Sequence, residues 1–188
     1  MFRFLFLSLV EQGGDWERKN QLLVYESVYL MITRKFKEAA RLLLDAVATF
    51  TTTELFSYTT FVLYACVLSL ISVDRKTLSS DILKSPEILS VLDDIPHLRE
   101  LLTSLYKCDY RSFFAALSGI TPTLQRTPYI AQHVKYYLRE LRVVAYTQFL
   151  SSYKAASLQA MADSFGQLHG TDSRCGSFAP SDALCRPL

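Results

Sequence analysis

The sequence predicts an all-α fold, a right-handed α-solenoid of paired, TPR-like helices. Apolar residues recur at steps of three and four along most of the 188 residues, which is the spacing of an amphipathic helix. Glycine and proline number six each, and several of them fall near the C-terminus, so the body of the chain holds few turn formers. With 50% hydrophobic residues, the chain has enough apolar material for the core of one domain.

Three helices are predicted in the first half of the chain. The first begins after Asp15, which can cap it, and its expected core face comprises Leu22, Tyr25, Tyr29 and Ile32. The second follows a turn at 34–35, and its apolar positions are Phe36, Ala39, Ala40, Leu43 and Val47. The small side chains among them let a neighbouring helix approach closely. The third is expected to be capped by Thr51 or Thr52. It should be buried on both sides, because residues 61–73 are apolar all round yet shorter than the roughly 20 residues needed to cross a bilayer.

The second half of the chain is predicted to form shorter helices followed by a long one. Helix starts are expected at Asp74, Ser85-Pro86, Pro96 and Asp109, and connections at Thr121-Pro122 and Thr127-Pro128. The helix that starts at Asp74 should reach about Leu83. The long helix is predicted over residues 131–153, with one face formed by Val134, Leu138, Leu141, Ala145 and Phe149. Ser157 can cap a last short helix over residues 158–165.

Two segments of the chain resemble each other. FKEAARLL at 36–43 and YRSFFAAL at 110–117 are 74 residues apart, close to two helix-pair repeats of roughly 34–40 residues. Stacked helix pairs hide their apolar faces only against the next pair. The similarity between the two segments therefore supports a solenoid.

No catalytic or metal-binding set stands out in the sequence. The three histidines, His97, His133 and His169, have neither the spacing of a helical metal pair nor an identifiable nucleophile. The carboxylate pair Asp93-Asp94 is expected to lie at a solvated helix end, and Gly13-Gly14 is not followed by the GK[ST] of a phosphate loop. We therefore expect no enzyme activity, no cofactor, no metal and no small-molecule substrate.

Lys135, Arg139 and Arg142 form a basic stripe at helical spacing on the predicted long helix. The whole chain has 20 basic and 18 acidic residues, a net charge of +2, so there is little reason to expect nucleic acid as a partner. We interpret the stripe as solvated or facing a protein partner, and contact with RNA is the alternative.

The N-terminus and the cysteines indicate in which cellular compartment the protein is expected. Residues 1–10 are apolar with one arginine, but the run is short for a secretory signal and lacks a small-residue cleavage site, so a truncated helix is favoured. The four cysteines form no CxxC pair, which favours a reduced, intracellular protein. No membrane association is expected.

Several ordered motifs carry a more specific signal. The segment GGDWERKN at 13–20 contains Gly13, Gly14, Asp15 and Trp16. The other motifs are RKFKEAA with Phe36, Ala39 and Ala40, ATFT with Phe50, SLYKCDY with Tyr110, LRELR with Arg139 and Glu140, SYK at 152–154, and MADSFG at 161–166. Over about residues 8–166 they resemble the family of 26S proteasome non-ATPase regulatory subunit 6, a helical-repeat plus PCI family of the proteasome lid.

The resemblance implies a helical-repeat arm that leads into a PCI domain with a winged helix. It implies a truncated helix remnant at 1–14, helical repeats with the helical part of the PCI domain at 15–156, the first helix of an incomplete winged helix at 157–166, and a disordered, divergent tail at 167–188. It also implies a non-catalytic scaffold that packs against other lid subunits in ubiquitin-dependent degradation, in the cytoplasm and nucleus. Signalosome or translation-initiation PCI scaffolds, and RNA-binding PCI proteins, are the alternatives. Because the solenoid lacks both of the family's ends, self-association of the isolated chain is expected.

Overall fold

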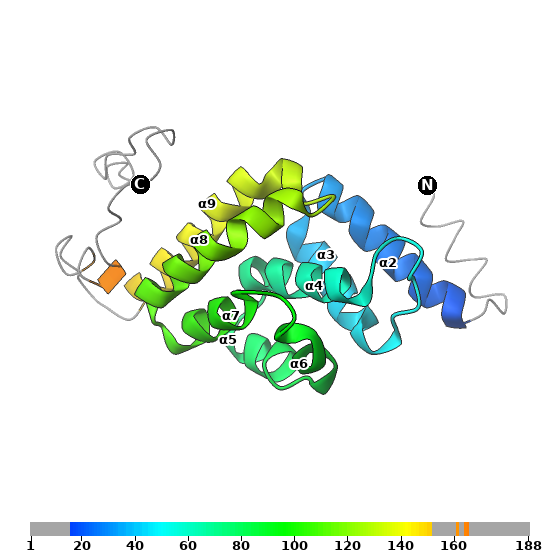
Figure 1. Cartoon of the computed structure of the whole chain (residues 1–188), viewed down its shortest axis with the longest axis horizontal. Coiled ribbons are helices and arrows are strands. Elements are labelled where there is room, and N and C mark those ends of the chain that lie inside the picture. The colour runs from blue at the N-terminus through cyan, green and yellow to red at the C-terminus, as the bar shows by residue number, and fades with distance from the viewer. Residues whose placement is uncertain (1–15, 152–160, 162–163, 166–188) are drawn as a thin grey trace.

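The computed structural model describes residues 16–151, 161 and 164–165, which form helices joined by short turns (Figure 1). The elements in chain order are α2 (Trp16–Ile32), α3 (Phe36–Ala46), the 3₁₀ turn η1 (Val47–Thr49), α4 (Tyr58–Ser72), α5 (Arg75–Thr77), the π-helical turn η2 (Leu78–Ile82), α6 (Pro86–Leu92), α7 (Leu98–Lys107), α8 (Tyr110–Arg126), the 3₁₀ turn η3 (Ala131–His133) and α9 (Val134–Leu150). The described residues contain no strand, and the prediction of an all-α solenoid is confirmed.

The two segments that resemble each other in sequence also begin helices after turns of the same geometry. Arg34 and Cys108 both adopt a left-handed conformation, with φ of 63° and 62°, after α2 and α7. In each turn the next residue's N–H reaches back five residues: Lys35 donates to the Leu30 carbonyl, and Asp109 to the Ser104 carbonyl, both at 2.9 Å. This is the Schellman arrangement that ends a helix. The hairpins α2–α3 and α7–α8 are therefore equivalent units of the solenoid.

Helix α4 is the centre of the core. Every residue from Phe61 to Leu70 is buried, as predicted for a helix packed on both sides. It contacts α3 on one side and α6, α7 and α9 on the others, and Figure 1 shows it between the α2–α3 hairpin and the long helices α8 and α9. Two tyrosine hydroxyls connect it to the C-terminal half: Tyr137 donates to the Val67 carbonyl at 2.6 Å, and Tyr64 donates to the Pro128 carbonyl.

The predicted core face of α2 is wrong. Tyr25, Tyr29 and Ile32 are 40%, 64% and 44% exposed, and α2 instead buries a stripe that includes Val24, Val28 and Met31 against its neighbours. The two stripes lie side by side around the helix, one residue apart in sequence, so the apolar period fits both. The tyrosines have hydroxyls that favour water, which suits them to the outer stripe.

The start of the third helix is also wrong. Helix α4 begins at Tyr58 and is capped by Ser57, whose hydroxyl accepts from the Thr60 N–H at 3.3 Å, and not by Thr51 or Thr52. The segment before it is held by aromatic packing, since the ring of Phe50 lies 4.5 Å from that of Phe61. Because this loop packs against the core, Thr51 and Thr52 lie several residues before the first turn of α4 and do not cap it.

The connection expected at Thr121-Pro122 is a further correction, because α8 continues through Pro122 to Arg126. Pro122 is exposed, so its ring meets solvent, while Ile120 and Leu124 on the inner face are fully buried. Burial of this face outweighs the loss of one helical N–H donor. The other predicted break, at Thr127-Pro128, does end the helix.

The remaining helix starts agree with the sequence to within a few residues. Asp109 caps α8 by accepting from the Ser112 N–H, and Pro86 is the first residue of α6 after Ser85. The helix expected from Asp74 is a single α-helical turn followed by the π-helical turn, and the helix expected at Pro96 begins at Leu98.

The last predicted helix lies mostly outside the described residues, including its proposed cap Ser157. Met161, Ser164 and Phe165 are described, and all three are helical. Phe165 is buried, with its ring 4.9 Å from those of Tyr110 and Tyr146. The chain therefore folds back onto α8 and α9 at this point. The signature residues Gly13, Gly14 and Asp15 and the tail from residue 167 also lie outside the described residues.

Candidate protein interaction site

The basic stripe lies on the outer side of α9. Lys135, Arg139 and Arg142 are all exposed, while Tyr137 and Leu141 on the inner side of the same helix are fully buried. Arg139 contacts the adjacent Glu140 at 3.3 Å, and within the described residues Lys135 and Arg142 form no ion pair. The predicted placement of the stripe on a helix surface is thus observed, although Arg139 is partly neutralised.

The stripe meets the α2–α3 turn at one tyrosine. The guanidinium carbon of Arg139 lies 5.4 Å from the centre of the Tyr136 ring, and that of Arg34 lies 6.0 Å from it. Both distances fit cation–π contact, which holds within about 6 Å. Arg34 projects from the left-handed turn residue described above, so the turn geometry places its charge beside α9.

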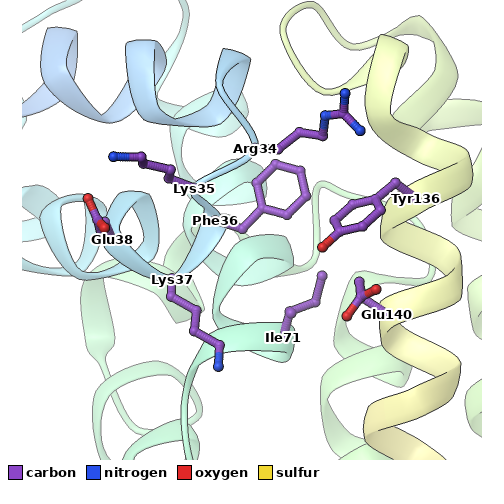
Figure 2. A pocket seen from close by; sticks show the side chains of 8 residues that line it. All are labelled: Arg34, Lys35, Phe36, Lys37, Glu38, Ile71, Tyr136 and Glu140. Carbon is purple, nitrogen blue, oxygen red and sulfur yellow. The ribbon is translucent and has the colours of Figure 1, made fainter.

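A cavity of about 270 Å³ lies where these elements meet. Figure 2 shows Phe36 beside Tyr136 and Arg34 extending toward the tyrosine, while Lys35, Lys37 and Glu38 lie on the other side of Phe36. The full lining is Arg34, Lys35, Phe36, Lys37, Glu38, Ile71, Tyr136 and Glu140. Helix α3 has no side-chain cap at its N-terminus, so its first N–H groups add partial positive charge here.

A larger cavity of about 540 Å³ adjoins the first and shares Lys37 and Ile71 with it. It lies between the C-terminal end of α4 and α9, and its apolar lining includes Val143, which is 50% exposed. At its far wall Gln148 donates to the Leu105 carbonyl at 3.1 Å and to the Cys108 sulfur at 3.0 Å. We call the two adjoining cavities the α3–α9 groove. One end of the groove is basic and the rest is mainly apolar.

A second exposed surface is the outer stripe of α2, formed by Tyr25, Tyr29 and Ile32. The Tyr25 hydroxyl donates to the Glu54 carboxylate, and this hydrogen bond raises the pKa of Tyr25 above its ordinary value. Aromatic side chains are enriched at protein–protein interfaces, so this exposed stripe is a candidate contact surface. The apolar period alone predicts a core face for these residues, and the structure places them on the surface.

Most of the family-signature residues support the fold and do not form a site. Phe36 is buried with its ring 6.1 Å from that of His133, and Ala39 and Ala40 are fully buried where α3 packs against α2 and α4. Tyr110 is buried beside Phe165. Trp16 begins α2, Phe50 packs in the loop before α4, and Glu140 lines the groove.

The residues considered for chemistry are surface or structural groups. His97 lies 3.4 Å from Glu100 in an exposed pair, and Asp93 pairs with Arg99. The His133 Nε2 lies 3.0 Å from the Ile32 carbonyl and so joins η3 to the end of α2. Over residues 16–151 and the three described residues beyond, no three His, Cys, Asp or Glu side chains gather as a metal site would require. Nor does this part of the chain contain a helix both long and apolar enough to span a membrane.

Comparison with known proteins gives consistent matches. Residues 6–81 match the family model described as 26S proteasome subunit RPN7. The chain is 54% identical over 158 residues to the 26S proteasome non-ATPase regulatory subunit 6 of Oryza sativa subsp. japonica, an alignment covering 84% of this chain and 41% of that protein. It is 40% identical over 182 residues to the 26S proteasome regulatory subunit RPN7 of Saccharomyces cerevisiae, covering 94% and 42% of the two chains. The chain thus spans less than half the length of these relatives.

Proposed function

Because the chain belongs to the family of 26S proteasome non-ATPase regulatory subunit 6, RPN7, we propose that it is a non-catalytic scaffold subunit of the regulatory particle lid. It would support ubiquitin-dependent degradation by packing against other lid subunits, in the cytoplasm and nucleus. The observation that carries the proposal is the match of 84% of the chain to a named proteasome regulatory subunit, on a fold of stacked helices.

The geometry of the described surface supports binding to proteins. The core is filled by apolar side chains from the longer helices α2, α3, α4, α6, α7, α8 and α9. Among the described residues, the outer stripe of α2 and the α3–α9 groove lie outside this core and are open to a partner. Aromatic and arginine side chains such as Tyr29 and Arg34 are the types that contribute most to protein interfaces.

The proposal includes the division of the chain into domains. Residues 15–156 would act as the helical-repeat arm with the helical part of a PCI domain, and residues 157–166 would begin its winged helix. The burial of Phe165 against Tyr110 and Tyr146 supports a continuous packing of these two parts. Residues 1–14 and 167–188 are assigned as a helix remnant and a tail on the resemblance alone.

Affinity purification of the tagged chain, followed by mass spectrometry, tests the proposed assembly. We expect lid subunits to be enriched over signalosome and initiation-factor subunits. Tyr29→Glu places a charge on the outer stripe of α2, which is 64% exposed at this residue, and should weaken the association without unfolding the chain. Arg126→Glu, at another exposed position, is the control and should leave the association unchanged. Enrichment of signalosome subunits in place of lid subunits would reject the proposal.

A further inference from the structure

We propose that the α3–α9 groove binds an acidic segment of a partner protein, with carboxylates at the Arg34–Lys37 end and apolar side chains along α9. The inference deepens the proposed scaffold function and rests on it, because it describes how one open surface of the solenoid would take a partner. The charge at one end of the groove and the apolar lining of the rest indicate a partner of this chemistry.

The basic end of the groove has cations that the chain itself leaves largely unpaired. Arg34, Lys35 and Lys37 are all exposed, and none of the three forms an ion pair within the described residues. The first cavity is lined by two carboxylates, Glu38 and Glu140, of which Glu140 is already paired with Arg139, and the second cavity is lined by Asp74 beside Arg75. Three cations on one turn and the helix after it would repel one another in the free chain. A partner carboxylate relieves this repulsion and forms charge-assisted hydrogen bonds.

The rest of the groove requires apolar residues in the same partner. Ile71 lines both cavities, and beyond it the lining continues with Val73, Leu105, Val143 and Val144. Val143 is 50% exposed although it is aliphatic, so covering it would remove apolar surface from water. An acidic segment that carries aliphatic side chains would fill both parts of the groove at once.

The lining favours a peptide over a nucleic acid. Phe36 and Tyr136 are the aromatic side chains lining the first cavity, and Phe36 is only 4% exposed. The Tyr136 ring is already contacted by the guanidinium groups of Arg34 and Arg139, which leaves no free ring on which a base can stack. Glu38 and Glu140 would also oppose a phosphate backbone, whereas a peptide can place neutral residues beside them.

Fluorescence anisotropy of the full chain with a labelled peptide tests the inference. The probe is a short fluorescein peptide in which glutamates flank two leucines, and its control has glutamine at each glutamate. The triple variant Arg34→Glu, Lys35→Glu and Lys37→Glu should weaken binding by about tenfold or more, as expected for the loss of several exposed ion pairs. The matched variant Arg18→Glu, Lys19→Glu and Lys84→Glu changes the net charge equally at exposed positions outside the groove, and should bind as the unchanged chain does.

Each alternative result overturns the inference. Equal loss of binding in both triple variants would mean that only the overall charge matters. Equal affinity for the glutamine peptide, or no binding of the glutamate peptide, would exclude an acidic segment. Binding of a labelled single-stranded RNA that is stronger than the peptide and is lost in the groove variant would assign the surface to nucleic acid. Because lid association is measured separately by purification, none of these results would by itself refute the scaffold function.

Discussion

Removal of a single hydroxyl at Tyr137 should destabilise the chain measurably, because this group connects the two halves of the solenoid. Tyr137 is fully buried on α9, and its hydroxyl donates to the Val67 carbonyl of α4 at 2.6 Å. Tyr137→Phe keeps the ring and its packing, so the loss is confined to one buried hydrogen bond. Such a loss costs about 1 kcal/mol in the free energy of unfolding. For a chain of this size it should lower the melting midpoint by roughly 3 °C.

Urea titration followed by circular dichroism gives the free energy of unfolding directly, and the adjacent Tyr136 provides a matched control. Tyr136 is half-buried, and its hydroxyl makes no hydrogen bond to any described residue. Tyr136→Phe should therefore change the unfolding free energy by only a few tenths of a kcal/mol. If Tyr137→Phe leaves the midpoint unchanged, or if both variants destabilise equally, the hydrogen bond does not hold α9 on α4 as we infer.

Three further predictions concern the core and the helix ends. Burial raises the pKa of the Cys66 thiol from 9.0 to about 12, so the thiol stays protonated when folded and ionises first in the unfolded chain. Below pH 9 the thiol is protonated in both states, and its contribution to the free energy of unfolding is complete. As the pH rises above 9 the free energy of unfolding falls, by about 2 kcal/mol at pH 10.5. Cys66→Ala should make the free energy of unfolding, measured by urea titration at several pH values, depend less on pH. Asp109→Ala removes the cap that accepts from Ser112 and should cost about 1 kcal/mol in thermal unfolding, whereas Asp109→Asn should cost less. Ala40→Leu should overpack the fully buried contact of α3 with its neighbours and cost about 1–3 kcal/mol in urea unfolding, and a neutral result would show that this contact is loose.

Local signals in the sequence were enough to place most helices. Asp109, Ser85-Pro86 and Thr127-Pro128 are found at helix ends because capping and proline geometry depend on only a few neighbouring residues. The resemblance between residues 36–43 and 110–117 also has a structural counterpart in the shared turn geometry. These features need no knowledge of the rest of the chain.

Choices that depend on distant contacts could not be made from the sequence. The two apolar stripes of α2 have the same period, and only the position of α3 decides that Val24 and Val28 are buried and Tyr29 is not. Pro122 is tolerated within α8 because it points to solvent, which the sequence does not show. The groove brings Lys37 to Tyr136, which is about a hundred residues away, and the residues of the basic stripe do not line it, so the sequence did not show that α3 and α9 form one site.

The position of α4 has a consequence for synthesis of the protein. This helix is apolar on every side, and the helices that cover it include α6, α7 and α9, all of which leave the ribosome after it. Helix α3 can cover one side of α4 at once, but until α9 has emerged the segment from Phe61 to Leu70 would remain partly uncovered on its other sides. Nascent chains in this state are prone to aggregate and are typical clients of chaperones. Chaperone capture of stalled nascent chains should therefore be strongest when synthesis stops between α4 and α9, and should decline once Tyr137 can reach Val67.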